Sequence, residues 1–254
     1  SKKELFNIFR EFSKEVHSRD TIRNFAMGEN GAEYILKLFG KKKLNVLTHC
    51  NAGALATCGY GTALGVVRSL HKKKLIKNVW IDETRPYLQG SRITAFEMVC
   101  ESIPHRIITD STAAWLMSQG MVDIVITGAD RVACNGDLAN KIGTYSLAVN
   151  AKYHNIPFMS VMPVETFDLT MENGSHIIIE ERSDEELLKI KNKRIATVTN
   201  FDFNYLLCNL VLGGFYLRLV CKVRLQLTGV INSFRNSGDF LSEKFVYLLI
   251  CSFF

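Results

Sequence analysis

Short apolar runs alternate with longer amphipathic segments through the middle of the chain. The apolar runs predict five strands, at 44–48, 78–81, 106–109, 123–127 and 157–161. The segments that follow them predict helices, at 61–71, 91–100, 111–119 and 139–154. Strands made of continuous apolar residues are buried on both faces, and their alternation with helices is typical of a parallel sheet. The pattern therefore predicts an open α/β sandwich.

The two ends of the chain differ from this middle part. Residues 3–17 carry apolar side chains at helical spacing, which predicts an amphipathic helix. A second helical stretch runs through Asn24, is interrupted at Gly28 and Gly31, and resumes at 32–39. After about residue 196 the alternation fades and no element is predicted. We therefore expect three parts: helical residues 1–40, an α/β domain at 41–196, and an atypical tail at 197–254 of uncertain structure.

Composition narrows the class of protein. A hydrophobic content of 47% and a charged content of 22% are those of a globular domain with a sizeable core. The net charge of +6 comes from scattered lysines, so we expect no nucleic-acid partner. The cysteines, seven in number, form no CxxC pair, which favours reduced thiols in the cytoplasm. We expect a cytoplasmic protein that is present in the nucleus as well. No apolar run reaches the roughly 20 residues that span a bilayer, and the first residues carry no signal-peptide pattern.

Reactive residues follow four of the predicted strands. These groups are 48–50, 82–85, 109–111 and 128–130. In open parallel sheets, ligands bind beyond the carboxyl ends of the strands, at a switch in strand order. The sequence therefore predicts a cleft at this edge of the sheet.

Cys50 and Asp130 are the candidate reactive pair at that edge. A Gly/Ala/Asn segment follows Cys50, and backbone amides there would lower the pKa of the thiol and favour the thiolate. The alternative is that Cys50 is a small buried apolar residue. Apolar neighbours such as Trp115 would raise the pKa of Asp130 and suit it to act as an acid. The alternatives are a helix N-cap and an ion pair with Arg131.

A polar cluster opens the predicted helix at 139–154. It contains Asn135, Asp137, Asn140 and Lys141. A lysine at a helix N-terminus opposes the helix dipole, so a bound anion such as a phosphate would explain Lys141, although a surface lysine is equally common.

The remaining polar candidates are Gln89 and His49. Gln89 either binds sugar hydroxyls or lies in a solvated turn. His49 has no second histidine at ligand spacing, so we interpret it as an orienting residue and expect no metal. The Gly-rich run at 53–65 lacks both a P-loop lysine and the GxGxxG pattern, so no nucleotide fold is indicated.

Taken together, these motifs resemble the methylthioribose-1-phosphate isomerase family. The resemblance runs from about residue 20 to 196. The matching segments are Leu47-Thr48-His49-Cys50-Asn51-Ala52-Gly53, Asp82-Glu83-Thr84-Arg85-Pro86, Leu88-Gln89-Gly90, Gly128-Ala129-Asp130-Arg131, Asn135-Gly136-Asp137, Asn140-Lys141-Ile142-Gly143-Thr144-Tyr145 and Glu180-Glu181-Arg182.

The resemblance implies a fold and an activity. The fold is an N-terminal helical domain, here reduced to linking helices, followed by a Rossmann-like α/β domain, as a homodimer. The activity converts the cyclic aldose 5-methylthioribose 1-phosphate into the ketose 5-methylthioribulose 1-phosphate in methionine salvage, with no cofactor. Cys50 and Asp130 match the catalytic pair, and Gln89, Asn140 and Lys141 match positions that hold the sugar phosphate.

The expected chemistry agrees with these residues. Phosphate on the anomeric oxygen blocks simple ring opening, so an acid must protonate the ring oxygen, and we assign that step to Asp130. A proton or a hydride must then pass between C2 and C1 beside Cys50, and the sequence leaves both routes open.

Two departures and two alternatives accompany the resemblance. The family's Arg-Gly-Ala turn and second phosphate-binding arginine have no counterpart in this sequence, nor does the family's Asn-Pro-Ala-Phe-Asp segment, so we expect weakened phosphate binding.

One alternative function is that of a scaffold like the regulatory subunits of the translation-initiation exchange factor, which generally lack the Cys–Asp pair. The other is ribose 1,5-bisphosphate isomerase, which shares the pair and differs in the pocket wall around the 5-substituent.

Overall fold

The α/β fold predicted from the sequence is confirmed by the computed structural model, which describes residues 1–179, 183, 185–195 and 248–251. A central sheet has the strand order β11-β7-β4-β1-β2-β3. All neighbouring pairs in it are parallel except β11 and β7. Its strands are β1 (Leu44–His49), β2 (Ile76–Asp82), β3 (His105–Ile108), β4 (Ile124–Thr127), β7 (Phe158–Val161) and β11 (Leu248–Cys251). The first five match the predicted strands to within two residues.

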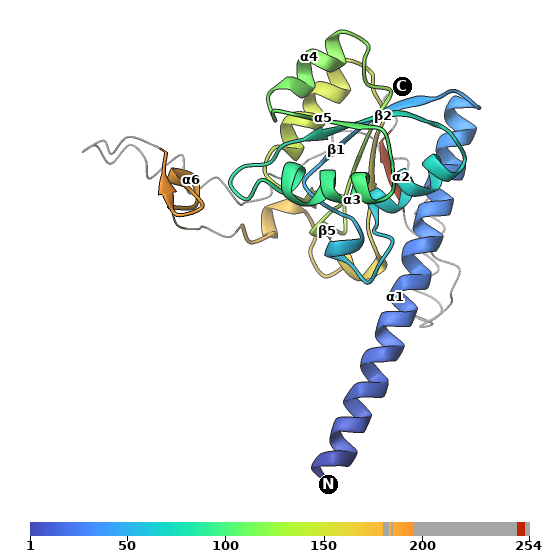
Figure 1. Cartoon of the computed structure of the whole chain (residues 1–254), viewed down its shortest axis with the longest axis vertical. Helices are drawn as coiled ribbons and strands as arrows, with labels where there is room; N and C mark the ends of the chain where they lie inside the picture. Colours follow the sequence, from blue (N-terminus) through green and yellow to red (C-terminus); the bar gives the residue numbers. More distant parts are fainter. Residues whose placement is uncertain (180–182, 184, 196–247, 252–254) are drawn as a thin grey trace.

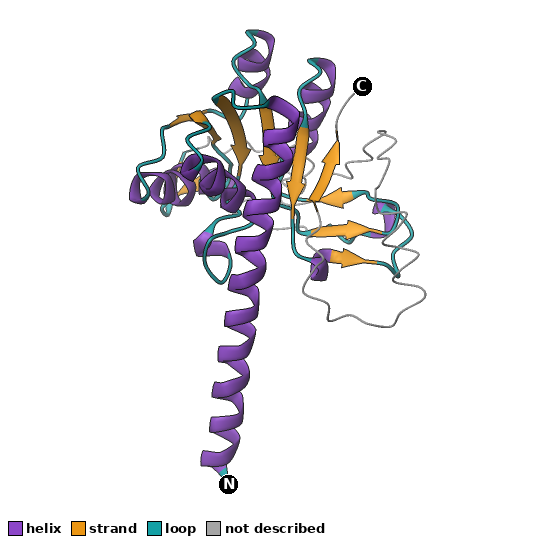
Figure 2. Ribbon diagram, turned by 90° about the vertical axis from the view of Figure 1, so that its right-hand side faces the viewer, coloured by secondary structure: helices purple, strands orange, loops and turns teal. Residues whose placement is uncertain are grey.

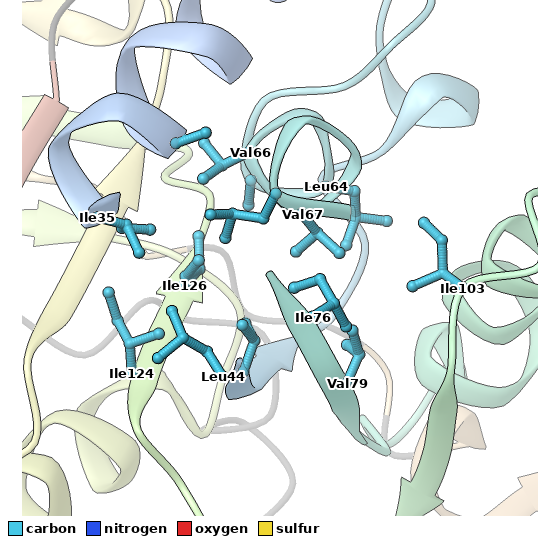
Figure 3. Packing of buried hydrophobic residues seen from close by; sticks show 14 of the residues in the cluster. Ile35, Leu44, Leu64, Val66, Val67, Ile76, Val79, Ile103, Ile124 and Ile126 are labelled. Carbon is cyan, nitrogen blue, oxygen red and sulfur yellow. The ribbon is translucent and has the colours of Figure 1, made fainter. Parts of the chain in front are cut away.

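Helices cover both faces of this sheet (Figure 1). One face packs against α1 (Lys2–Phe39), α2 (Ala63–Lys72) and α3 (Ala95–Cys100), and the other against α4 (Thr112–Ser118) and α5 (Thr144–Tyr153). Side chains alternate along each strand, so Val46 of β1 faces the first layer while Leu47 faces the second. Figure 3 shows the first layer, where Ile35 of α1 and Val66 of α2 lie above Ile124 and Ile126 of β4.

The strand order reverses between β1 and β4. The chain builds outward from β1 through β2 to β3, then crosses back to place β4 on the other side of β1. The connections leave the carboxyl ends of β1 and β4 in opposite directions, which opens a crevice between them. The fold therefore places its binding crevice where Cys50 and Asp130 follow the two strands.

The N-terminal segment is one continuous helix, so the prediction of linking helices interrupted by glycine is wrong. Gly28 and Gly31 lie inside α1 because they allow close packing against α2. A Cβ atom at Gly28 would lie 2.8 Å from the carbonyl oxygen of Gly65, and one at Gly31 would lie 2.5 Å from Val66 Cγ2. Close helix contact outweighs the low helix propensity of glycine here.

The first half of α1 projects beyond the α/β body (Figure 2). Its apolar stripe, predicted from the spacing of the side chains, is largely exposed, as Phe9 and Phe12 illustrate at 61% and 62%.

The predicted helix at 139–154 starts later than expected. Residues 131–139 form a hairpin of β5 (Arg131–Ala133) and β6 (Leu138–Ala139), so the first residue of the predicted helix lies in a strand, and β5 also pairs with β8 (Phe167–Asp168). The helix α5 begins only at Thr144. The other short elements are η1 (Ala54–Ala56), the π-helical η2 (Gly90–Thr94), η3 (Val164–Thr166), η4 (Gly174–His176), α6 (Glu185–Leu188), β9 (Lys189–Ile190) and β10 (Lys193–Arg194).

The tail predicted at 197–254 lies outside the described residues, apart from β11. The division of the chain into three parts stays a prediction. No helix among the described residues is long and apolar enough to cross a membrane.

Candidate active site

A cavity of about 920 Å³ opens where β1 and β4 end. Its wall includes all five residues that the sequence predicts for the site: Cys50, Gln89, Asp130, Asn140 and Lys141. The volume falls in the range of small-molecule pockets. The groups after β3, at 109–111, are absent from this wall because β3 is the far edge strand of the sheet.

Cys50 directly follows β1 and has a left-handed backbone conformation, with φ at 63°. This conformation is uncommon for a residue with a Cβ atom and is held by its surroundings. The hydroxyl of Thr94 donates to the carbonyl oxygen of Cys50 at 2.5 Å. The result is a half-buried thiol that faces the cavity rather than the core.

Burial raises the pKa of the Cys50 thiol, so the expectation of a lowered pKa is wrong. The backbone amide of Asn51 and the charge of Lys141 lower it, but desolvation is larger than both, and the nearby Asp130 raises it further. Cys50 therefore holds its proton at neutral pH.

Asp130 lies between β4 and β5, with its carboxyl group on the cavity wall. Water reaches the group, yet the surrounding protein desolvates it and raises its pKa, with Lys141 acting in the opposite direction. Neither alternative interpretation holds. A strand follows Asp130, so there is no helix to cap, and Arg131 pairs with Asp168 at 3.0 Å. Trp115 is not the desolvating group, because it lies on α4 with 59% of its surface exposed and is absent from the cavity wall.

Asn140 and Lys141 lie in the loop between β6 and α5, and both are buried. Asn140 Nδ2 donates to the hydroxyl of Thr144 at 3.0 Å, and that hydroxyl donates to the carbonyl oxygen of Lys141 at 2.6 Å. Lys141 is 9% exposed, and its ammonium group lies 5.4 Å from the ring centre of Tyr87. The interpretation as a surface lysine is therefore wrong.

Asn135 and Asp137 lie in a β-hairpin and not at the start of a helix, where the sequence predicted them. They lie in the turn between β5 and β6 and are absent from the cavity wall. Asn135 Nδ2 donates to Asp137 Oδ2 at 2.9 Å, and the same oxygen accepts from the backbone amide of Gly174 at 2.9 Å. These two residues stabilise the hairpin.

Gln89 connects Thr84 to Lys141 on the cavity wall. When its amide is oriented so that both the nitrogen and the oxygen have partners, the nitrogen donates to Thr84 Oγ1 at 2.8 Å and the oxygen accepts from Lys141 Nζ at 3.2 Å. Gln89 is thus fixed beside the cavity and does not lie in a solvated turn.

His49 forms a buried pair with Asp82 behind the cavity. Its Nδ1 lies 2.7 Å from Asp82 Oδ2, and its Nε2 lies 2.6 Å from the carbonyl oxygen of Ile142. A carbonyl only accepts, so Nε2 carries a hydrogen. Burial raises the pKa of Asp82 to about 6, against the opposing effect of its hydrogen bond with His49. The pair ties the end of β1 to the loop that carries Lys141.

The neighbouring residue in that loop, Gly143, also depends on this ring. Its φ is 101°, and a Cβ atom there would lie 2.6 Å from His49 Cε1. The orienting role that the sequence suggests for His49 therefore has a geometric basis.

We expect Asp82→Ala to lower the free energy of unfolding by about 2–4 kcal/mol, because it leaves the buried imidazole without its partner. Asp82→Asn is the matched control. Its amide can donate to Nδ1 of a neutral His49, so the expected loss is below about 1.5 kcal/mol. Urea unfolding followed by far-ultraviolet circular dichroism measures both. Equal losses in the two variants would show that the pair does not hold this loop.

Sequence reasoning missed the contribution of α1 to the cavity. Arg19, Asp20, Arg23 and Asn24 all line the wall. Arg23 forms an ion pair with Glu165, which also lines the cavity. The available signal was the spacing of the two arginines, which places them on one helix face.

The described residues contain no cluster of three or more His, Cys, Asp or Glu side chains able to hold a metal ion.

Known proteins are similar to this chain in sequence and in fold. The model of the Initiation factor 2 subunit family matches residues 2–223. A methylthioribose-1-phosphate isomerase of Vitis vinifera is 52% identical over 185 residues, covering 72% of this chain and 49% of that protein. One of Aquifex aeolicus is 61% identical over 164 residues, covering 65% of this chain and 35% of that protein.

Solved structures agree. The 5-methylthioribose 1-phosphate isomerase of Pyrococcus horikoshii has a TM-score of 0.72 at 44% identity, covering 78% of this chain and 54% of that one. A structure described as translation initiation factor eIF-2B, subunit delta, from A. fulgidus has a TM-score of 0.70 at 43% identity, covering 78% and 56%.

The crevice and these matches place the chain in a class of α/β proteins that have a parallel sheet and a cavity at the strand switch point. The chain belongs to the Initiation factor 2 subunit family. It spans about half the length of the curated relatives it matches.

Proposed function

We propose that this chain carries the active site of an aldose–ketose isomerase that converts 5-methylthioribose 1-phosphate into 5-methylthioribulose 1-phosphate. One observation carries the proposal: Cys50 and Asp130 follow the two strands that flank the switch point and line one cavity. The relatives from Vitis vinifera and Aquifex aeolicus are named for this reaction.

Each residue of the cavity wall has a role in this proposal. Asp130, whose pKa is raised by burial so that its protonated form is more populated than that of a free carboxyl group, donates its proton to the ring oxygen as the bond from C1 to this oxygen breaks. Cys50 acts beside C1 and C2, where a proton or a hydride passes from C2 to C1, and the carboxylate left on Asp130 takes up the proton of the C2 hydroxyl as the ketone forms. Lys141 pairs with the phosphate, while Gln89 and Asn140 bind the sugar through hydrogen bonds. No cofactor takes part.

The homodimer and the cytoplasmic location implied by the resemblance belong to the same proposal. Sedimentation velocity over a range of protein concentrations tests the first of these.

A scaffold without catalysis is the second candidate, favoured by the similarity to the structure described as eIF-2B subunit delta. A scaffold has no need of an acid and a thiol on one cavity wall, and this pairing supports the enzyme instead.

Ribose 1,5-bisphosphate isomerase shares the pair and has to be tested directly. The cavity wall offers apolar side chains, Leu55 and Val161, as well as the cations Arg19 and Arg23. An apolar surround suits a methylthio group, while the cations suit a second phosphate.

The decisive experiment incubates the 254-residue chain with either sugar phosphate and follows ketose formation by proton NMR. We expect the methylthio sugar to be converted at a rate at least about tenfold above that of ribose 1,5-bisphosphate. The reverse preference would favour the bisphosphate isomerase. Conversion of neither substrate would contradict an enzymatic function for this chain.

A further inference from the structure

We propose that Glu97 is a positioning residue for Cys50, fixing from behind the segment of chain that carries the thiol. Glu97 lies on α3, outside the cavity wall, and is 4% exposed. No sequence motif pointed to Glu97, because a single glutamate within a predicted helix is typical of a solvent-exposed helix face.

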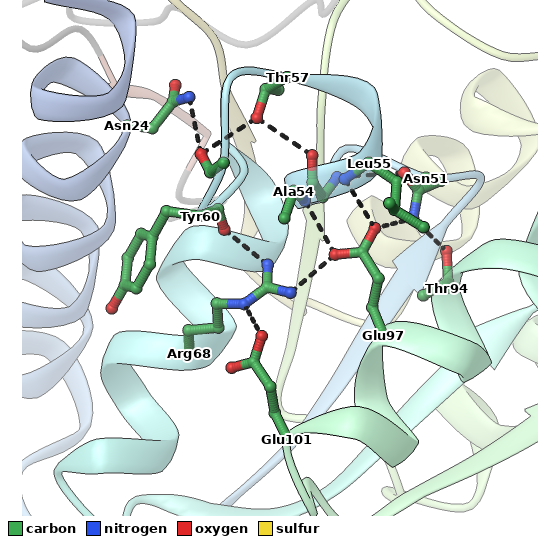
Figure 4. Close-up of polar contacts among 12 residues, drawn as sticks. Asn24, Asn51, Ala54, Leu55, Thr57, Tyr60, Arg68, Thr94, Glu97 and Glu101 are labelled. Carbon is green, nitrogen blue, oxygen red and sulfur yellow. Dashed lines mark hydrogen bonds and ion pairs between the residues drawn. The ribbon is translucent and has the colours of Figure 1, made fainter. Parts of the chain in front are cut away.

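The Glu97 carboxylate is surrounded by donors, as Figure 4 shows. Oε1 accepts from Asn51 Nδ2 at 3.0 Å and from the backbone amide of Leu55 at 3.3 Å. Oε2 accepts from the backbone amide of Ala54 at 2.8 Å and from Arg68 Nη2 at 2.7 Å. Three of these four donors belong to residues 51–55, so one buried side chain fixes the segment that directly follows Cys50.

A continuous path of hydrogen bonds leads from Glu97 to the thiol residue. Asn51 Nδ2 also donates to Thr94 Oγ1 at 3.1 Å, and that hydroxyl donates to the carbonyl oxygen of Cys50. Cys50 needs such support because its left-handed conformation is unfavourable for a residue with a side chain. The Asn51 backbone amide, which lowers the pKa of the thiol, belongs to the same fixed segment.

Arg68 completes the arrangement by holding the far end of the same loop. It is 3% exposed, and its Nη1 donates to the carbonyl oxygen of Tyr60 at 2.5 Å. Its Nε donates to Glu101. At the near end, Gly53 is pressed against Glu97, since a Cβ atom there would lie 2.3 Å from the carboxylate. The loop along the cavity is therefore held at both ends by one ion pair.

Glutamine cannot replace Glu97 in this position. Each carboxylate oxygen accepts from two donors, so either orientation of the glutamine amide directs its NH₂ group at two further N–H groups. Glu101→Gln is the matched control. Glu101 is the second carboxylate paired with Arg68, and a glutamine there still offers an oxygen that can accept from the Arg68 Nε. The Glu101 side chain makes no hydrogen bond to residues 51–55.

The test compares Glu97→Gln and Glu101→Gln by two readouts. The first is iodoacetamide alkylation of Cys50 against pH, read by mass spectrometry, with fragment ions separating Cys50 from Cys58 and the exposed Cys100 as internal reference. In Glu97→Gln we expect the midpoint pH at Cys50 to rise by at least about 0.5, because the Asn51 amide no longer faces the sulfur. In Glu101→Gln we expect a change below about 0.2.

The second readout is ketose formation, which alone rests on the proposed function. We expect kcat to fall at least about tenfold in Glu97→Gln with KM within about threefold of wild type. If neither the wild type nor the variants turn over substrate, the alkylation of Cys50 still decides the role of Glu97.

A Cys50 midpoint in Glu97→Gln that is unchanged or lower would overturn the proposal, as would an equal rise in Glu101→Gln. Circular dichroism establishes whether each variant folds. If Glu97→Gln fails to fold, Thr94→Val, which removes only the hydroxyl bound to the Cys50 carbonyl, must show the same upward shift, and its absence would overturn the proposal.

Discussion

Cys50→Ser is expected to lower kcat for ketose formation by a factor of at least about 10³, equivalent to about 4 kcal/mol of activation free energy. A serine hydroxyl has nearly the same size as the thiol, so the cavity wall and the fold are preserved. Its proton is far harder to remove, so far less of the reactive anion forms near neutral pH. Substrate binding through Lys141 and Gln89 is untouched, so KM should stay within about threefold.

The measurement is a steady-state assay of the purified variant beside Cys100→Ser, which removes an exposed thiol from the surface of α3. Cys100→Ser should keep wild-type turnover. Wild-type turnover in Cys50→Ser would show that the thiol takes no part in the chemistry and would leave Asp130 as the only reactive group of the proposal.

The strands and the five cavity residues were predictable because their signals are local. A buried strand needs only a run of apolar residues, as in Ile124–Thr127, and the parallel arrangement then places whatever follows each strand at one edge of the sheet. Cys50 and Asp130 meet at the cavity for this reason.

The start of α5 was mispredicted although a signal was present. Asn135-Gly136 is a dipeptide typical of a hairpin turn, and Gly136 adopts a φ of 89° there. The apolar residues on either side pair as β5 and β6 instead of continuing a helix.

Other properties depend on contacts between distant segments and leave no local trace. The pKa of the Cys50 thiol is raised because the folded protein surrounds it, whereas the sequence shows only the amides that follow it. Glu97 gains its importance from a loop more than 40 positions earlier in the chain. Likewise, Gly28 and Gly31 look like helix breakers until α2 packs against them.

The second large effect is expected for Asp130→Asn, which should lower kcat by a factor of about 10²–10⁴, the usual contribution of a general acid. The amide has the shape of the carboxylic acid but no proton acidic enough to reach the ring oxygen. The pH dependence separates this role from a structural one. Burial raises the pKa of Asp130, so the protonated form persists above the usual range of a carboxyl group. The wild-type kcat should therefore fall as pH rises through this raised pKa.

In Asp130→Asn that decline with rising pH should disappear, because the residual activity no longer depends on a proton held there. Asp110→Asn is the matched control: it follows β3 at the same edge of the sheet, yet it does not line the cavity. It should keep both the turnover and the pH profile of the wild type. An Asp130→Asn variant that retains the decline would assign the titrating group to another residue, and one with wild-type kcat would exclude Asp130 as the acid that opens the sugar ring.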